Sequence, residues 1–244
     1  MSPEEYANLE KVERTHWYYA GKREIVKYWI RKTYGMRRSF RLLDCGAGSG
    51  AFAESLCKEM SMIAMDDHKE SLEILERRIP RESVVSGSCT SIPFPEDSFE
   101  IVTALDVVEH IPNDHLAVKE MTRVLKPGGI MVITVPAMMC LWSDWDETLH
   151  HQRRYSKTSL LKLFQIPNLE VLHSAYINSL AMPLVWLARK ARRLGIGTDS
   201  RAEDQIPPAV LNHFLHFAFV APGCSRLQLP FGVGLLLIAR KNVA

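Results

Sequence analysis

Three histidines stand where they could accept protons during a reaction. His110 follows an apolar segment at 100–104, and His150 and His151 lie together in a later aromatic segment. An imidazole titrates near neutral pH, so it is a natural general base for a hydroxyl or an amine that must lose a proton. We therefore predict His110, His151 and His150 as candidate catalytic residues, with a loop or helix-capping role as the alternative for each.

Two acids accompany His110 and raise the question of a metal ion. Asp106 and Glu109 precede it in the pattern Asp-x-x-Glu-His. With the two later histidines they would offer the carboxylate and imidazole ligands that divalent ions bind. Because both acids can equally cap the helix that follows, we expect no bound metal.

Aromatic and basic side chains fill the segment 137–155. Rings beside guanidinium groups can stack on a planar acceptor or hold an anionic one through paired hydrogen bonds. The alternative is that the rings pack this segment onto the core and that the arginines are solvated or paired. The candidate substrate residues are Trp142, Arg153, Arg154 and Tyr155.

A glycine-rich turn offers a second kind of site. The apolar run 41–44 leads into Gly46-Ala47-Gly48-Ser49-Gly50 and then into a helical pattern. Such a turn lets the backbone approach a ligand closely and directs free N–H groups at it. The turn lacks the last glycine of the dinucleotide fingerprint and follows an acid, which favours a cationic or zwitterionic ligand over a pyrophosphate. Asp66, at the end of the next predicted strand, could accept both hydroxyls of a ribose, whereas Asp67 could simply cap the next helix.

The elements that must position these residues alternate along the chain. Short apolar runs followed by helical patterns are typical of a parallel sheet with crossover helices on both faces. The sequence therefore predicts an α/β fold. We expect strands at 41–44, 62–66, 84–86, 100–104, 130–136, 169–177 and 232–240, and helices at 16–34, 51–59, 69–79, 114–125 and 156–165.

Two insertions interrupt this alternation. Residues 137–155 follow the fifth strand, and residues 180–230, which are mostly helical, precede the last one. Insertions at strand ends are where α/β folds place substrate recognition, because the sheet is a rigid platform on which loops can vary.

Composition limits the classes of protein to consider. Hydrophobic residues make up 47% of the chain and charged residues 24%, which is typical of a globular protein. The formal net charge of +2 is too small for nucleic-acid binding to be the main task. Five scattered cysteines without a Cys-x-x-Cys pair favour neither disulfides nor zinc. With a polar N-terminus and no long apolar run, we expect a cytoplasmic location.

Four segments of the chain, taken in order, have a more specific meaning. They resemble the motifs of the class I S-adenosylmethionine-dependent methyltransferases. The resemblance implies a Rossmann-like sheet of seven strands, six parallel and the last antiparallel, with helices on both faces and a helical insertion before the last strand. The segments are Leu43-Asp44-Cys45-Gly46-Ala47-Gly48-Ser49-Gly50, Ala64-Met65-Asp66, Ile92-Pro93-Phe94-Pro95-Glu96-Asp97-Ser98-Phe99-Glu100-Ile101-Val102 and Arg123-Val124-Leu125-Lys126-Pro127-Gly128-Gly129.

The same resemblance implies roles at the matching positions. Asp44 would orient the turn and the methionine amino group, and Asp66 would hold the ribose. Ser88 stands where the family often has an acid beside the adenine, and a hydroxyl there would hold the adenine less firmly than a carboxylate. The predicted cofactor residues are Asp44, Gly46, Ala47, Gly48, Asp66, Asp67, Ser88, Cys89 and Leu105.

A tighter resemblance to a bacterial subgroup of small-molecule methyltransferases extends over the flanks, at 16–19, 104–110, 141–143 and 151–155. It implies an enzyme that uses S-adenosyl-L-methionine and releases S-adenosyl-L-homocysteine, but it does not identify the acceptor. Together with the candidate histidine bases, the family resemblance leads us to expect a small-molecule acceptor, methylated on oxygen in preference to nitrogen or carbon. One alternative is a methyltransferase for a lipid or glycolipid at the membrane surface, since 180–194 reads as a basic amphipathic helix. Another is a non-catalytic partner subunit that only binds the cofactor.

We expect the whole chain to form one methyltransferase domain that acts as a monomer or homodimer, with no nucleic-acid partner and with peripheral membrane contact not favoured. Its expected parts are an N-terminal helical cap at 1–38, a cofactor-binding core at 39–179, a helical insertion or lid at 180–230 and the last strand at 231–244.

Overall fold

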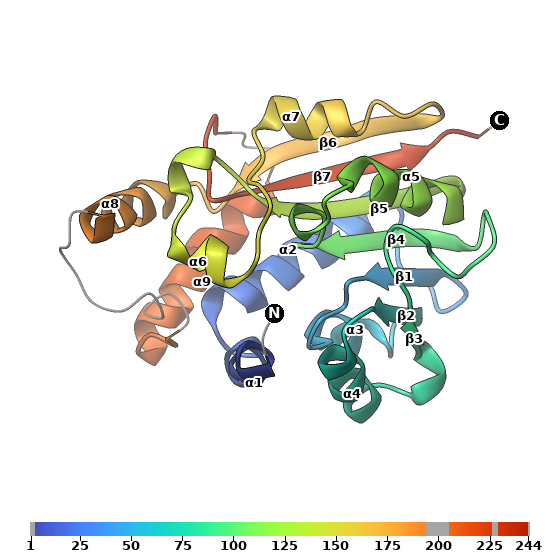
Figure 1. Ribbon diagram of the computed structural model, residues 1–244, viewed down its shortest axis with the longest axis horizontal. Coiled ribbons are helices and arrows are strands. Elements are labelled where there is room, and N and C mark those ends of the chain that lie inside the picture. The colour runs from blue at the N-terminus through green and yellow to red at the C-terminus, as the bar shows by residue number, and fades with distance from the viewer. Residues whose placement is uncertain (1–2, 194–204, 226–228, 244) are drawn as a thin grey trace.

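Seven strands form one sheet in the computed structural model, which describes residues 3–193, 205–225 and 229–243 (Figure 1). Their order across the sheet is β3-β2-β1-β4-β5-β7-β6. The strands are β1 (Arg41–Cys45), β2 (Ser61–Asp66), β3 (Val84–Ser86), β4 (Phe99–Leu105), β5 (Leu125–Pro136), β6 (Leu169–Ile177) and β7 (Gly234–Lys241).

The α-helices of the described residues are α1 (Pro3–Val12), α2 (Trp17–Thr33), α3 (Ala51–Leu56), α4 (Lys69–Arg78), α5 (Asp114–Val124), α6 (Asp144–Thr148), α7 (Lys157–Leu163), α8 (Met182–Arg193) and α9 (Ala209–Gly223). Short 3₁₀ turns lie at η1 (Arg81–Ser83), η2 (Val108–His110) and η3 (Met139–Leu141).

The direction of the strands confirms the predicted fold class. Strands β1 to β5 pair in parallel, and β7 runs antiparallel to both of its neighbours, β5 and β6. The described part of the sheet therefore contains six parallel strands and one antiparallel strand, the Rossmann-like arrangement that the sequence predicts. Parallel strands covered on both faces need near-continuous apolar sequence, and the central part of β5 is buried throughout.

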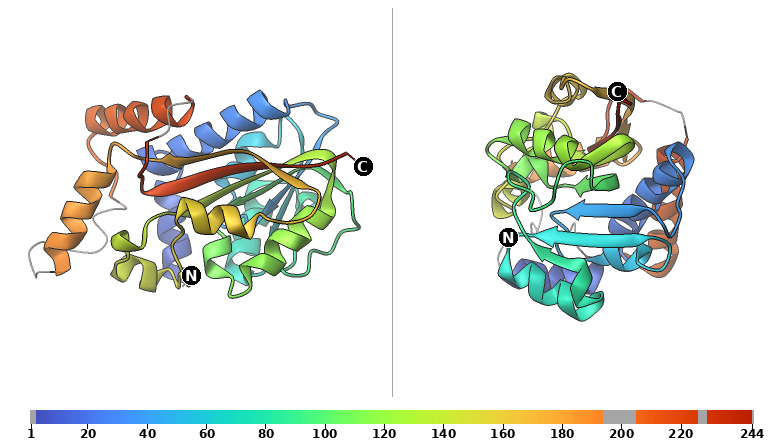
Figure 2. Two further views of the ribbon diagram at one scale, coloured as in Figure 1. Left: turned by 90° about the horizontal axis from the view of Figure 1, so that it is seen from above. Right: turned by 90° about the vertical axis from the view of Figure 1, so that its right-hand side faces the viewer.

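Helices cover both faces of the sheet (Figure 2). Alternate residues of β5 show the division: Met131 and Ile133 belong to one core with α5 and α7, whereas Ile130 and Val132 belong to the other with α2 and α9. The cores are separate because successive side chains of a strand point to opposite faces.

Two element boundaries differ from expectation by three residues or more. The helix expected at 51–59 ends at Leu56, because the amides of Glu59 and Met60 both turn back to the Leu56 carbonyl. The strand expected to start at 130 starts at Leu125, and a register shift between Phe99 and Ile101 accommodates the Pro127-Gly128-Gly129 segment.

The second insertion packs against the N-terminal helices. The indole nitrogen of Trp29 in α2 donates to the carbonyl of Gly223 in α9 at 2.8 Å, and the ring of Phe219 stacks on Tyr18. Residues 194–204 and 226–228 of this insertion lie outside the described residues. No helix in the described ranges is both long and apolar enough to cross a membrane.

The sheet places the ends of its parallel strands at one edge. Strand β1 lies between β2 and β4, so the connections that leave β1 and β4 diverge at this point. Such a switch point leaves a crevice outside the carboxyl ends of the strands. In Figure 1 the arrowheads of β4 and β5 point to this edge, where α6 and the beginning of α2 also lie.

Candidate functional site

A cavity of about 910 Å³ opens at the carboxyl ends of β1, β2 and β4. The volume is near the upper end of the roughly 300–1,000 Å³ typical of ligand sites. The glycine turn after β1 lines one half, and the start of α2, the η2 turn and the α6 segment line the other.

The glycine turn is held in a left-handed conformation that exposes its backbone to the cavity. Gly46 and Gly48 have φ values of 65° and 57°. A Cβ at Gly46 would lie 2.7 Å from side-chain carbons of Val107, whereas a Cβ at Gly48 would meet nothing within 4 Å. Gly46 therefore packs tightly against the connection after β4, while Gly48 faces open space.

Asp66 fixes this turn from the neighbouring strand. Its carboxylate accepts the amide of Gly48 at 2.9 Å and the amide of His68 at 3.0 Å. The amide of Ala47 donates to the carbonyl of Met65 at 3.0 Å. These bonds join the ends of β1 and β2 and put the carboxylate at the cavity wall.

Asp44 is a buried acid directly before the turn. Its carboxylate accepts a hydrogen bond from Thr103 Oγ1 at 2.7 Å. Burial raises the pKa of Asp44 to about 7, although the Thr103 hydrogen bond opposes the shift and the nearby Asp66 adds to it. Asp44 can therefore change its charge near neutral pH at the bottom of the cavity.

All the predicted cofactor residues line this half of the cavity. Ser88 Oγ lies 3.0 Å from Thr90 Oγ1, and the exposed carboxylate of Asp67 lies 2.8 Å from His68 Nδ1. Leu105 is the last residue of β4 and Cys89 is buried.

The three predicted catalytic histidines line the other half. The His151 Nδ1 lies 2.8 Å from Asp146 Oδ1, which also accepts the Arg154 guanidinium at 2.7 Å. Burial raises the pKa of Asp146, but His151 and Arg154 outweigh it and bring the value down to about 2. An ionised partner at Nδ1 makes this nitrogen the donor and leaves Nε2 of a neutral His151 as an acceptor.

His110 packs edge-on against His151, with 4.7 Å between the ring centroids. Burial, and then the neighbouring His151, lower the pKa of His110 to about 4. His110 is therefore neutral at physiological pH. His150 adopts a left-handed backbone with φ of 58°.

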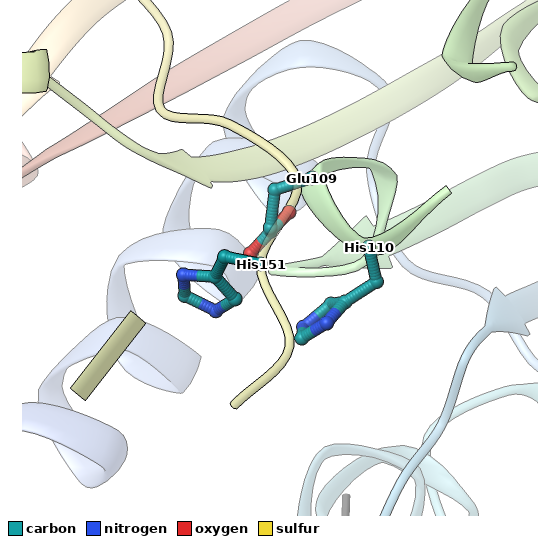
Figure 3. A group of neighbouring side chains, drawn as sticks. All are labelled: Glu109, His110 and His151. Carbon is teal, nitrogen blue, oxygen red and sulfur yellow. The ribbon is translucent and has the colours of Figure 1, made fainter. Parts of the chain in front are cut away.

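Glu109 completes a group of three side chains with His110 and His151 (Figure 3). One ligand atom from each lies within 4.8 Å of the others, so the group has the composition of a metal site. Asp106, the other acid of the Asp-x-x-Glu-His pattern, instead binds Lys22 and Thr134. Burial, and then the charge of Asp106, raise the pKa of Glu109 well above its usual range.

The ion pair between Lys22 and Asp106 is a feature that sequence reasoning missed. It joins α2 to the end of β4, and the Lys22 ammonium also lies 4.3 Å from the centre of the Tyr18 ring. Burial lowers the pKa of Lys22, but Asp106 and Tyr18 outweigh this and raise it. Burial raises the pKa of Asp106, but Lys22 brings it below the ordinary value. The sequence offered one signal for this ion pair, because Lys22 lies on the apolar side of the helix predicted at 16–34.

His16 and the aromatic residues that follow it also line the cavity. His16 caps α2 by accepting the amide of Tyr18 through Nδ1, and its side chain is buried. The sequence marked 16–19 only through resemblance, because an N-cap histidine has no pattern of its own.

Of the predicted substrate residues, only Arg154 is among those that line the cavity. Arg153 forms an ion pair with Asp114 at 2.6 Å, and Tyr155 donates to the same carboxylate at 2.7 Å. The indole of Trp142 lies 3.4 Å from a Glu147 oxygen. Arg153 and Tyr155 make the contacts expected if the segment packs onto the core, because Asp114 begins α5 beneath it, whereas Trp142 bonds within the segment.

Among the comparisons with known proteins, a family model matches the central strands. A family model described as "Methyltransferase domain" matches residues 43–133. A probable S-adenosylmethionine-dependent methyltransferase of Mycolicibacterium smegmatis is 26% identical over 59% of this chain and 60% of its own length. The demethylmenaquinone methyltransferase of Staphylococcus aureus is 33% identical over 43% of this chain and 48% of its own length. The chain spans between 30% and 61% of the length of these curated relatives.

Among solved structures, the putative methyltransferase of Haloferax volcanii, in complex with the Trm112 methyltransferase activator, matches 98% of this chain and 95% of its own length. The TM-score is 0.64 and the sequence identity 16%, a likeness of fold.

We expect Asp44→Asn to change how stability depends on pH. The carboxyl has a pKa of 3.8 when unperturbed and about 7 in the folded protein. Between these values the folded state holds a proton that the unfolded state has lost, so this group makes stability fall as pH rises. Asparagine does not titrate. Between pH 5 and pH 8 the free energy of unfolding of the variant should therefore rise by on the order of 2 kcal/mol relative to that of the wild type. Urea unfolding of both proteins at pH 5 and pH 8 measures this difference in free energy. If the free energy of unfolding changed equally with pH in the two proteins, the prediction would be contradicted.

Proposed function

We propose, from the premise that this chain belongs to the class I S-adenosylmethionine-dependent methyltransferase family, that it transfers a methyl group to a small-molecule acceptor. One observation carries the proposal: a single cavity runs from the glycine turn and Asp66 to the Asp146–His151 pair. The two reactants of a transfer must meet in line, and such a cavity has room to hold both.

The residues of the first half fit S-adenosylmethionine, the cofactor of the family. Gly48 faces open space and leaves its backbone free for close approach. Asp66 would accept the ribose hydroxyls, Asp44 would face the amino group, and Ser88 and Cys89 would lie beside the adenine. When bound, the cofactor supplies a methyl group on a positively charged sulfur.

The residues of the second half fit an acceptor that must lose a proton. Asp146 keeps the His151 ring oriented, and a neutral Nε2 can take a proton from a hydroxyl or an amine as the new bond forms. His151 is therefore our leading candidate for the general base. The neutral ring of His110 packs against it and lines the cavity. A hydroxyl gains most from a base, and we therefore favour oxygen as the methylated atom over nitrogen or carbon.

We expect the purified protein to bind S-adenosylmethionine and S-adenosylhomocysteine in a one-to-one ratio, and not NAD. Asp66→Ala removes the carboxylate that fixes the turn and would hold the ribose, so affinity should fall at least tenfold, as for loss of a charged hydrogen bond. Isothermal titration calorimetry measures this.

The matched control is Asp67→Ala, which removes the exposed neighbouring acid. It should weaken binding several-fold less than Asp66→Ala. The absence of binding by the wild type would contradict the proposed function, and equal losses in the two variants would contradict the role of Asp66.

We expect His151→Ala to lower kcat about 10²–10⁴-fold on any acceptor found by screening with labelled methyl donor, which is the usual contribution of a general base. His150→Asn is the control, since asparagine tolerates the left-handed backbone at that position. Affinity for S-adenosylhomocysteine should stay within a few-fold in both variants. If His150→Asn lost as much activity as His151→Ala, the assignment of the base would be wrong.

A second candidate function, methylation of a lipid at the membrane surface, is favoured by one observation. Helix α8 contributes Val185 and Arg189 to the cavity wall, while its outer face exposes Leu184 and Leu187. Helix α9 exposes further apolar residues, and both helices lie at the same end of the molecule (Figures 1 and 2). The exposed Lys190 beside Trp186 would suit an anionic surface.

If this second function holds, the protein should sediment with vesicles that contain phosphatidylglycerol. The double change Leu184→Ser and Phe214→Ser removes side chains that are 71% and 63% exposed, and should reduce sedimentation at least tenfold. Val243→Ser, at a residue 76% exposed near the other end of the sheet, is the control and should have no effect. A wild type that stays in the supernatant would eliminate the lipid version.

A further inference from the structure

Glu109 is a fully buried acid whose carboxylate has no bonding partner on another side chain in the described ranges. It lies in the η2 turn after β4 and lines the cavity. Neither carboxylate oxygen has a hydrogen-bond partner within the described residues. A buried polar group without a partner is costly, so such a group in a cavity wall is expected to meet one when a ligand is bound.

The buried cations nearby already have partners. Lys22 pairs with Asp106, and Arg154 and Arg189 converge on Asp146. In the part of the chain that the structure describes, these pairings leave Glu109 as the acid of the acceptor half that no basic side chain satisfies. The missing partner must therefore come from outside these pairs.

The spacing of the neighbouring groups fits one inserted donor atom. A carboxylate oxygen of Glu109 and a ring nitrogen each of His110 and His151 lie within 4.8 Å of one another. Figure 3 shows the carboxylate directed toward the His151 ring. A donor atom about 2.8 Å from each of two acceptors can bridge a gap of this size.

We propose that Glu109 binds the acceptor, by accepting a hydrogen bond from a hydroxyl or ammonium group that lies between its carboxyl group and the imidazole of His151. This inference rests on the proposed function and narrows it. The acceptor carries a hydrogen-bond donor at this position. Burial raises the pKa of Glu109, so a bound ammonium group would favour its ionised form, whereas a carboxylate or phosphate would oppose ionisation and gain no ion pair. His151 then takes the proton of the group to be methylated, and Glu109 selects acceptors that present such a group.

Ring-matched probes test this selection without knowledge of the natural acceptor. Benzylamine, benzyl alcohol and benzoate share a ring and differ in the charge and donors of the attached group. In the presence of S-adenosylhomocysteine, we expect the wild type to bind benzylamine and benzyl alcohol at least tenfold more tightly than benzoate, as measured by ligand-observed NMR. Equal affinities would overturn the proposal by themselves, so the test does not depend on a variant that folds.

Glu109→Gln keeps the shape of the side chain and removes its ability to ionise beside a bound ammonium group. We expect the preference for benzylamine over benzoate to fall at least tenfold in this variant, with its melting temperature unchanged or raised, since an unsatisfied buried acid has been removed. The control is Glu82→Gln, an exposed acid that does not line the cavity, which should keep the wild-type preference. A Glu109→Gln protein that melts several degrees lower and keeps the preference would show a structural role instead and overturn the proposal.

Two further measurements separate the competing explanations. Mass spectrometry that found a stoichiometric divalent ion in the wild type, lost in Glu109→Gln, would assign the carboxylate to a metal and overturn the proposal. Titration of the wild type with S-adenosylhomocysteine tests the proposed function separately. A preference for benzylamine without cofactor binding would support the donor site and contradict the methyltransferase.

Discussion

The hydrogen bond from the Gly48 amide to the Asp66 carboxylate is the contact on which the cavity depends. It links the turns that follow β1 and β2, neighbouring parallel strands that end at the same edge of the sheet. The other oxygen of Asp66 accepts the amide of His68 just before α4 begins, so one side chain holds the glycine turn and the start of a helix. A glycine backbone can adopt many conformations by itself, and this hydrogen bond stabilises one of them.

In the half of the cavity proposed to bind the acceptor, buried ion pairs join segments that are distant in the sequence. Lys22 and Asp106 bring the N-terminal helix to the end of β4, and Asp146 gathers His151, Arg154 and Arg189 around the α6 segment. Buried ion pairs contribute little net stability because desolvation offsets their attraction, but leaving either partner alone is expensive. They therefore act mainly by fixing where distant segments meet.

The fold, and the meeting of the candidate cofactor residues at one cavity, could be predicted because they depend on local patterns. Alternating apolar runs and helices specify the sheet, and the carboxyl ends of parallel strands must share an edge, so Asp44, Asp66 and Leu105 come together. The acceptor half depends on contacts between distant residues. The sequence does not reveal that Lys22 meets Asp106 across 84 positions, or that Asp114 faces Arg153 and Tyr155 and turns them away from the cavity. A side chain in a loop has no periodicity to show which way it points.

The same division explains how far the relatives can guide the choice of acceptor. The matched domain, residues 43–133, contains the glycine turn, Asp66 and the Glu109-His110 pair. Lys22, Asp146 and His151 lie outside it, on elements that are inserted or appended to the sheet. Left-handed backbone also occurs there, at His150 and Asn178, which line the cavity. Charge-held segments around a rigid sheet can change without disturbing the fold. The choice of acceptor therefore depends on this chain's own cavity wall, which combines Glu109 of the matched domain with His151 outside it.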